Sequence, residues 1–405
     1  MSDEKQKAFE FKPPFIILRS RRVTGIFNWA ARRKFFGPLG WFMVALLPIA
    51  AAIGIFLIAN AVSSMLVSPE VREAGRQMGA QAYLLIPGIN PYLPIAYGWI
   101  GIAVAIVVHE FSHGIMASRL GFKVKSSGIL LLLGIPIGAF VEIDEQQLKE
   151  ASLKKSARVL AAGPGANIAF AVACLLALLV LVSGLSPSLD GLYVSKVEAG
   201  MPAQQAGISE GDVIVSVNGK QALTVDVLKQ ALDNPPPDGK ILLEIRKGGG
   251  WKDSMTVELA PVETREGPRI GVYVVELRTT IILENYKRLA YSSPMLYFIP
   301  PTMGNAQGFI PFSDLLHVFY QHPIGPGYYY VANLLFWLWF INVNVGIFNS
   351  LPIYPLDGGQ MFMGGLRALA KSRLTEPVIR VITGAVSATL VTLVVSMVLL
   401  PFLIK

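Results

Sequence analysis

The residues best suited to chemistry lie within the short stretch 107–114, which contains His109, Glu110 and His113. On a helix, residues four positions apart share a face, so both imidazoles can bind one Zn²⁺ while the carboxylate between them addresses a water that the metal activates. Zinc lowers the pKa of such a water to about 7, and a neighbouring carboxylate can pass its proton to a departing amine. The pattern predicts metal-assisted hydrolysis of an amide bond, with Glu110 as general base.

A hydrolytic zinc site normally has three protein ligands and one open position, so a third ligand remains to be found. Asp357 is the strongest candidate, because it follows an apolar segment in a stretch that Pro352 and Pro355 interrupt. The two glycines that follow it allow a close approach of the backbone. As an alternative, Asp357 only caps a helix over 360–371. The competing ligands come from an earlier loop and are Glu142, Asp144 and Glu145.

The composition indicates that a lipid bilayer surrounds much of the chain. Of the 405 residues, 53% are hydrophobic and only 15% are charged, which is too apolar for an ordinary soluble enzyme. A helical span needs about 20 apolar residues. We predict at least five spans, over 39–66, 92–108 with a continuation into the histidine motif, 159–183, 328–350 and 381–403, the last two within a C-terminal membrane part over 328–405.

The basic residues that give a net charge of +8 gather beside alternate spans rather than on one soluble face. The first 38 residues carry nine Lys or Arg, segment 67–94 carries only Arg72 and Arg76, and segment 119–158 is basic again. This alternation predicts a multi-pass protein of the cell membrane, with residues 1–38 and 119–158 in the cytoplasm and 184–327 outside it. It indicates topology, and no nucleic-acid partner is expected.

Residues 186–262 have soluble character. Alternating strand patterns such as 212–217 and 241–245, joined by Gly and Pro turns, predict a small β-rich domain with a helix over 225–232. Its sequence resembles a PDZ domain, in which a peptide binds as an added strand with its C-terminal carboxylate on backbone amides. The resemblance implies a groove at Gly191, Leu192 and Tyr193. Alternatively, this domain only screens bulky substrates or packs against the membrane part.

Segment 128–142 is apolar, yet too short and too interrupted by Gly and Pro to cross a membrane. Non-helical backbone at membrane depth needs protein or a water-filled cavity to satisfy its amides, so we predict a re-entrant hairpin. Its edge is expected to hold an unwound substrate beside the zinc, through Ile135, Gly138 and Phe140. An amphipathic loop without a functional role is the alternative. Residues 263–327 are predicted to form a loop at the membrane surface.

Three motifs together resemble the site-2 protease family of intramembrane zinc metalloproteases, peptidase family M50, in its PDZ-containing subgroup. They are the histidine motif at the end of the core span, the Gly-Pro-Gly-Ala-Asn stretch 163–167, and the stretch 349–358 that contains Asp357. The resemblance implies one Zn²⁺ per chain on His109, His113 and Asp357, and a contact of Asn167 with the substrate backbone or the oxyanion. An amide can donate to a developing oxyanion without adding charge. Hydrogen bonding between helices is the alternative role for Asn167.

These inferences together predict a multi-span α-helical membrane protein with a protease core over 92–183, a re-entrant β-hairpin and one inserted PDZ-like α+β domain. By the same resemblance, it cleaves within or near the transmembrane segments of single-span membrane proteins, after another protease has removed their extracytoplasmic part. A metal-binding transporter or a PDZ-bearing adaptor is the rival function. An adaptor does not need Glu110 between the histidines. Transporters usually contain repeats, and the sequence contains no second copy of the motif.

Overall fold

A computed structural model describes the chain except residues 1–8, 21–22, 133–134, 249, 266, 305, 371–372 and 405, and except the side chains of 132, 135–137, 145, 149 and 294. The chain forms two compact units. The first unit contains Met1–Leu178 and Leu334–Lys405, and the second contains Leu179–Asn333.

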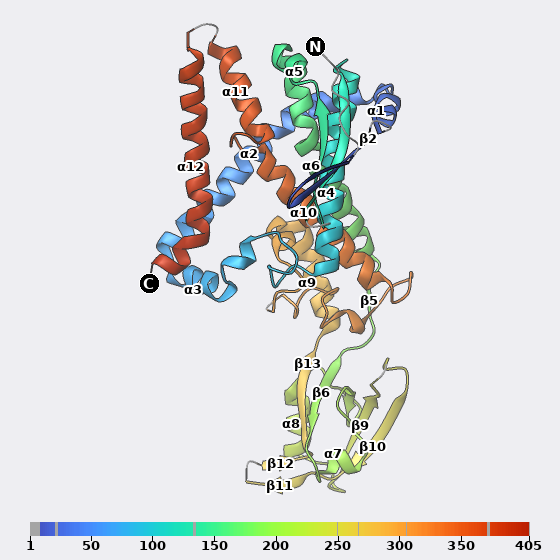
Figure 1. Cartoon of the computed structure of the whole chain (residues 1–405). Helices are drawn as coiled ribbons and strands as arrows, with labels where there is room; N and C mark the ends of the chain where they lie inside the picture. The colour runs from blue at the N-terminus through green and yellow to red at the C-terminus, as the bar shows by residue number, and fades with distance from the viewer. Residues whose placement is uncertain are drawn as a thin grey trace. The chain divides into compact units, whose positions relative to one another are not determined.

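Five helices in the described part of the chain are long and apolar enough to cross a membrane, which confirms the predicted number of spans. Each coincides with one of the predicted segments apart from a few residues at its ends, and the second continues through the histidine motif. In the first unit, the last of the five lies beside the first (Figure 1). The five are α2 (Phe36–Val67), α4 (Ile95–Arg119), α6 (Leu153–Ser183), α10 (Tyr328–Ser350) and α12 (Glu376–Leu403).

Shorter helices of the first unit close the ends of these spans. Helix α3 (Pro69–Met78) begins after Ser68, whose hydroxyl accepts a hydrogen bond from the Val71 N–H, with a proline at its first position. Arg76 of this helix donates to the carbonyls of Pro401 and Ile404, at 3.0 and 3.1 Å. These carbonyls have no partner within a helix that ends there, so the guanidinium satisfies the end of α12. The other short helices are α1 (Val23–Ala31), η1 (Ala80–Tyr83), α5 (Glu145–Glu150) and α11 (Asp357–Ala370).

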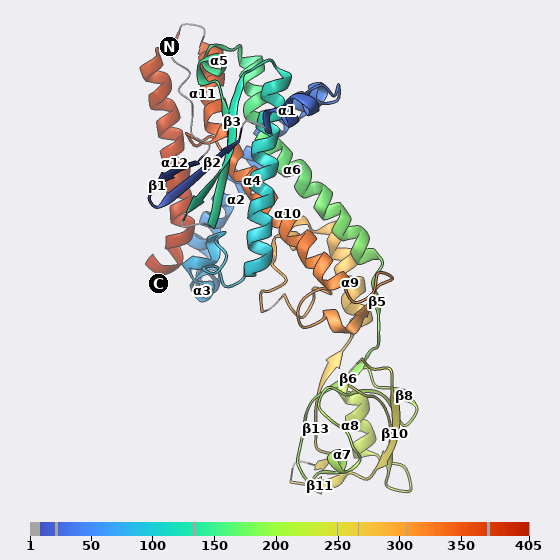
Figure 2. The same ribbon diagram turned by 45° about the vertical axis from the view of Figure 1, so that its right-hand side comes forward.

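A four-stranded antiparallel sheet lies along α4 in the first unit (Figure 2). Its order follows the chain: β1 (Phe9–Lys12), β2 (Phe15–Ser20), β3 (Val124–Leu132) and β4 (Ile135–Ile143). Strands β3 and β4 form a hairpin where the sequence predicts one. The pairing of β2 with β3 was not predicted, because the N-terminal segment was interpreted only as a basic flank of the first span. Strand β4 is the edge of this sheet beside α4.

The second unit contains a β-rich domain whose main sheet has the order β10-β9-β7-β6-β13, with β8 added to β7. Its core is apolar and includes Leu192, Ile214 and Leu243, which are fully buried. The strands are β6 (Gly191–Val197), β7 (Val213–Val217), β8 (Lys220–Gln221), β9 (Ile241–Arg246), β10 (Ser254–Leu259) and β13 (Val272–Leu277), and the helices are α7 (Pro202–Gln205) and α8 (Val225–Asp233). Residues 191–277 are named the PDZ-like domain after the resemblance of their sequence alone.

Segment 263–327 contains more regular structure than the predicted surface loop. Strand β13 completes the sheet of the PDZ-like domain by pairing with β6. Helix α9 (Thr279–Ser292) buries Leu283, Tyr286 and Ala290, which recur at helical spacing. Prolines and glycines elsewhere in this segment favoured the prediction of a loop, so the strand pattern of β13 and the helical pattern of α9 were missed. The remaining short elements are β5 (Ser186–Pro187), β11 (Val262–Thr264), β12 (Gly267–Arg269), η2 (Pro294–Phe298), η3 (His317–Phe319) and β14 (Tyr320–Gln321).

Candidate metal centre

Three potential metal ligands converge between α4 and the start of α11. The Nε2 atoms of His109 and His113 lie 3.1 Å apart, and Asp357 Oδ2 lies 3.1 and 3.3 Å from them. The three ligand atoms are within 4.8 Å of one another, and all three side chains are largely buried. Two imidazole nitrogens and one carboxylate oxygen are a donor set that zinc prefers. This group could hold a zinc ion.

The other ring nitrogens of both histidines have hydrogen-bond partners that determine which nitrogen faces the metal. His113 Nδ1 lies 2.7 Å from the carbonyl oxygen of Val159, and His109 Nδ1 lies 2.8 Å from Asn167 Oδ1. Since a carbonyl oxygen only accepts, each Nδ1 carries a proton and donates it. Both Nε2 atoms then direct lone pairs toward the carboxylate of Asp357, and a cation between them satisfies all three groups.

Asp357 reaches the histidines because two glycines follow it. A Cβ at Gly358 would collide with the backbone of Ser350, and one at Gly359 would collide with the backbone of Ile353. Helix α11 therefore begins directly against the loop that follows α10. The close backbone approach expected from the sequence is present, and it brings Asp357 to the ligand atoms of α4.

Gly163 brings α6 against the same imidazoles. A Cβ at this position would lie 2.7 Å from His109 Nε2 and would also collide with His113 Nε2. From the sequence, Gly163 is expected only to allow close packing of helices. The structure shows that the absence of a side chain at residue 163 makes space for the two ligand nitrogens.

The family of the chain can be decided by comparison with known proteins. The profile of Peptidase family M50 matches residues 97–393, which include all three potential ligands. The chain belongs to peptidase family M50, the site-2 protease family. It is accordingly a zinc metalloprotease and a multi-pass membrane protein that acts on membrane substrates.

Several curated proteins are similar to this M50 protease along most of its length. An uncharacterized protein of Methanocaldococcus jannaschii is 27% identical over 352 residues, covering 85% of this chain and 75% of that protein. A Clostridium perfringens protein named "putative zinc metalloprotease" is 24% identical over 314 residues, covering 69% and 90%. The zinc metalloprotease RasP of Oceanobacillus iheyensis is 22% identical over 249 residues, covering 55% and 54%.

In this M50 protease, the side chain of Asn167 forms hydrogen bonds with protein groups on neighbouring helices. Its side chain is fully buried, and its Nδ2 donates to the carbonyl oxygen of Ala105 and to Asn342 Oδ1, both at 2.9 Å. Its Oδ1 accepts from His109. Both of its donor hydrogens are thus directed at protein groups. These partners agree with the alternative role, hydrogen bonding between helices, with the orientation of His109 as its result, and the contact of Asn167 with a substrate or an oxyanion stays a prediction.

Asn342 is a residue of this network that the sequence analysis missed. It lies on α10, is fully buried, and donates through Nδ2 to the carbonyl of Leu338 at 2.8 Å while its Oδ1 accepts from Asn167. A ligand histidine of α4 is thus connected through α6 to α10. The signal that could have identified Asn342 is a polar residue in an apolar span, because such residues are costly in a bilayer.

Glu110 is connected to the edge strand of the sheet. Its Oε2 accepts a hydrogen bond of 2.9 Å from the backbone N–H of Val141 in β4. Gly138 and Phe140 lie in the same strand, as does Ile135, whose side chain lies outside the described residues. The carboxylate predicted to be the base and the strand predicted to hold the substrate are therefore in direct contact.

The competing acids have other partners in the part of the chain that the structure describes. Glu142 accepts a hydrogen bond of 2.8 Å from the hydroxyl of Ser126. Asp144 caps α5, and the Gln147 N–H together with the Lys125 ammonium holds the pKa of its carboxyl below the usual range. The side chain of Glu145 lies outside the described residues. Asp357 is thus the acid that meets the two histidines.

The predicted peptide groove of the PDZ-like domain also needs correction. Leu192 and Tyr193 lie in β6, which pairs with β13 on one side and with β7 on the other. Gly191 is buried, and a Cβ there would lie 2.8 Å from Val213 Cγ1. A strand whose backbone is paired on both sides cannot accept an added strand. Among the described strands of this sheet, β13 and β10 are the edges, and β13 lies beside α8.

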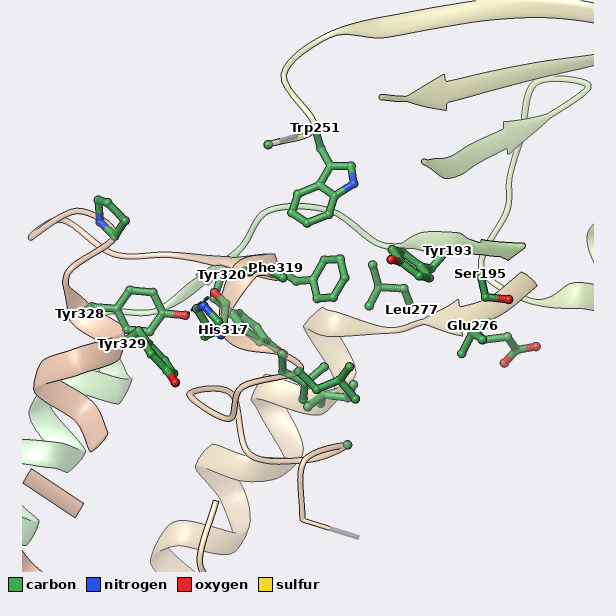
Figure 3. A pocket seen from close by; sticks show the side chains of 18 of the residues that line it. Tyr193, Ser195, Trp251, Glu276, Leu277, His317, Phe319, Tyr320, Tyr328 and Tyr329 are labelled. Carbon is green, nitrogen blue, oxygen red and sulfur yellow. Dashed lines mark hydrogen bonds between the residues drawn. The ribbon is translucent and has the colours of Figure 1, made fainter. Parts of the chain in front are cut away.

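The second unit also contains a pocket of about 1090 Å³ with a largely aromatic lining (Figure 3). Trp251 stacks on Phe319 with ring centres 4.7 Å apart, and the Tyr193 ring meets the edge of Phe319 at 5.9 Å. The Trp251 indole N–H donates to the carbonyl of Gly211. The pocket wall therefore joins the PDZ-like domain to segment 315–330 of the same unit. None of the three potential metal ligands lines it.

Proposed function

We propose that this M50 protease hydrolyses peptide bonds within or next to the transmembrane segments of single-span membrane proteins. In this proposal His109, His113 and Asp357 hold zinc, and Glu110 is the general base. The observation that carries it is the convergence of three ligand atoms within 4.8 Å, next to Glu110, on helices of a membrane-spanning unit. Binding zinc alone does not require a carboxylate at that position, so the arrangement favours hydrolysis over transport or an adaptor function.

The chemistry can be divided between the metal and the protein. When bound, zinc polarises the scissile carbonyl and makes water acidic enough to react near neutral pH. Glu110 accepts a proton from that water and delivers it to the leaving amine. Because Oε2 of Glu110 accepts from the Val141 N–H, we assign the proton transfer to Oε1. The Asn167 and Val159 oxygens keep both Nδ1 protons in place, so the Nε2 lone pairs stay directed at the metal.

We assign substrate binding to the outer edge of β4, in a hairpin that re-enters the membrane. A peptide bond inside a helix is inaccessible, so the substrate has to be extended before it is cut, and an unpaired strand edge can hold it. The Val141 N–H points away from β3, toward Glu110. Backbone direction alternates along a strand, so Ala139 directs its N–H and C=O to the same side. Ala139 thus offers its N–H and C=O and Val141 its C=O, while Gly138 leaves space beside the strand and Phe140 offers side-chain surface.

We further propose that the PDZ-like domain lies outside the cytoplasm and binds the C-terminus of a substrate that another protease has trimmed. The position of α8 beside the edge strand β13 supports a peptide site between them, as in PDZ domains. The basic residues of 1–38 and 119–158 support a cytoplasmic location for those segments. The metal centre then lies within the membrane, toward its cytoplasmic side.

The decisive experiment measures cleavage of a model transmembrane substrate in detergent by the wild type and by Glu110→Gln. We expect zinc to stay bound in the variant and cleavage to fall by about 10²- to 10⁴-fold, the typical cost of losing a general base. Glu142→Gln, a matched change in β4, should cleave like the wild type. Equal activity of wild type and Glu110→Gln would exclude the catalytic role.

The ligand assignment has its own test. We expect Asp357→Ala to lose stoichiometric zinc, measured by metal analysis of the purified protein, because two imidazoles alone leave the site one ligand short. Asp144→Ala is the matched control, since Asp144 caps α5. Full zinc content in Asp357→Ala, or its loss in Asp144→Ala, would reassign the third ligand.

A further inference from the structure

The N-terminal hairpin extends the sheet that carries the proposed substrate edge. In the pairing of β2 with β3, Arg19 lies opposite Gly128, and in the pairing of β3 with β4, Gly128 lies opposite Phe140. These three residues form one row across three strands. The row therefore connects a segment near the N-terminus to the strand that contacts Glu110.

Arg19 and Phe140 contact each other across the glycine between them. The Arg19 guanidinium carbon lies 5.6 Å from the centre of the Phe140 ring, within the range of a cation–π interaction. A Cβ at Gly128 would lie 2.7 Å from Phe140 Cε1, so the ring occupies the space above the glycine. The guanidinium also forms an ion pair with Glu10 of β1. Arg19 thus connects β1 and β2 to the side chain of the edge strand.

A role in membrane topology does not by itself explain the contacts of Arg19. Its guanidinium is paired with Glu10, a carboxylate that Lys12 also contacts, so the position of Arg19 is set by a cluster of charges within the sheet. The Arg19 side chain is only 20% exposed. An arginine whose sole role is to keep its segment on the cytoplasmic side of the membrane can remain in water and needs no protein partner. The contacts of Arg19 are directed into the sheet.

The position of Phe140 matters because its neighbour Val141 donates the backbone hydrogen bond to Glu110. We propose that Arg19 is a positioning residue of the protease: through Phe140, it fixes the edge of β4 beside Glu110. This inference rests on the proposed function, in which that edge receives the substrate. A shift of the strand would misalign both the substrate backbone and the donor to Glu110, while the zinc ligands would remain in place.

The test compares Arg19→Met and Arg19→Lys with the wild type in zinc content, melting temperature and cleavage kinetics on a model transmembrane substrate. In Arg19→Met we expect unchanged zinc, a KM raised about tenfold and a smaller fall in kcat, while Arg19→Lys, which keeps a cation over the ring, recovers most of the loss. Arg33→Met is the matched control, because the Arg33 guanidinium lies 4.9 Å from the ring of Trp29, which is exposed. It should behave like the wild type.

A double-mutant cycle shows whether Arg19 acts through Phe140. If it does, Arg19→Met combined with Phe140→Leu should be no worse than Phe140→Leu alone, whereas additive losses contradict the inference. A wild-type KM in Arg19→Met, in a protein whose Glu110→Gln variant is inactive, overturns the inference and leaves the proposed function standing. A fall in zinc content or melting temperature that accounts for the lost cleavage also overturns it. If Arg19→Met does not accumulate, Phe140→Leu replaces it, because it removes the ring from the same contact, and an unchanged KM there has the same meaning.

Discussion

Two buried aspartates, one in each unit, show how different the metal centre and the PDZ-like domain are. Asp212 is 1% exposed, and its oxygens accept hydrogen bonds from the Lys247 ammonium and from the N–H groups of Ser209 and Gly248. The Asp357 side chain is also largely buried, at 13% exposed, but the atoms closest to its Oδ2 are two imidazole nitrogens whose protons lie on the far side of each ring. The first carboxylate is satisfied by donors, whereas the second shares its site with two further acceptors.

The comparison teaches that burial of a charge does not identify a functional site, and that the chemistry of its partners does. Around Asp212, every neighbouring group supplies a proton, so the carboxylate stabilises a loop without any ligand. Around Asp357, three acceptors face one another, an arrangement that needs a cation or an added proton between them. The predictions below test this contrast.

The largest effect is expected for Gly163→Ala. The new methyl group would occupy the space of the two ligand nitrogens, so we expect zinc binding, which is worth about 10 kcal/mol or more in structural sites, to be essentially lost. Metal analysis and cleavage measure this together. Gly384→Ala in α12 is the control, because nothing lies within 4 Å of a Cβ there. Stoichiometric zinc in Gly163→Ala would mean that the close approach of α6 is unimportant for the metal.

Asp212→Asn should destabilise the PDZ-like domain without changing the zinc content of the protein. Removing the charge weakens the hydrogen bonds that this buried carboxylate accepts, one of them from the partly exposed Lys247 ammonium, which should cost about 1–3 kcal/mol in the free energy of unfolding. Proteolysis or hydrogen exchange of the domain should detect this change, and the zinc content should remain that of the wild type. Asp226→Asn, on the exposed side of α8, is the control. Zinc loss in Asp212→Asn would remove the distinction between the two aspartates.

A smaller effect is expected for Asn342→Leu. Without the Asn342 oxygen, the Asn167 amide loses a partner and holds His109 less firmly, so we expect zinc affinity to fall about 10- to 100-fold. A competition titration with a chelator measures the affinity. Asn344→Leu is the control, because it changes the same residue type two positions away, where the amide donates to the carbonyl of Phe340 within its own helix. Equal affinities in the two variants would exclude a role for the network.

The smallest effect concerns pH. Burial raises the pKa of the Asp190 carboxyl, but hydrogen bonds from Thr280 N–H and from the Thr279 hydroxyl outweigh burial and hold it below the usual range. A lowered pKa in the folded state contributes stability above the unfolded value of about 3.9, and this contribution is lost as the pH falls through the folded value. Asp190→Asn should therefore lower the melting temperature by about 2 °C at pH 7 and by less near pH 3. A difference that stays constant with pH would contradict this account.

Local spacing explains what could be predicted from the sequence. The ligands of α4 are four residues apart, and the spans are continuous apolar runs, so both follow from short segments. Asp357 was predictable because prolines and glycines mark its loop. The hydrogen-bond partners of Asn167 could not be predicted, because Asn342 is 175 residues away along the chain. The pairings of β2 and β13 could not be predicted either, because both strands pair with strands that are far away in the sequence. The alternation of residues within a strand does not indicate which other strand it pairs with.

The order in which the ligands occur along the chain has a consequence for biosynthesis. A nascent chain that has already inserted α4 and α6 carries both imidazoles and Asn167, but it still lacks Asn342 and Asp357. The centre is therefore incomplete until the ribosome has passed residue 357, when four of the five spans have been made. A chain that stalls or is truncated earlier brings two histidines into the membrane without the carboxylate, so an unfinished protease has no complete centre with which to cut its neighbours.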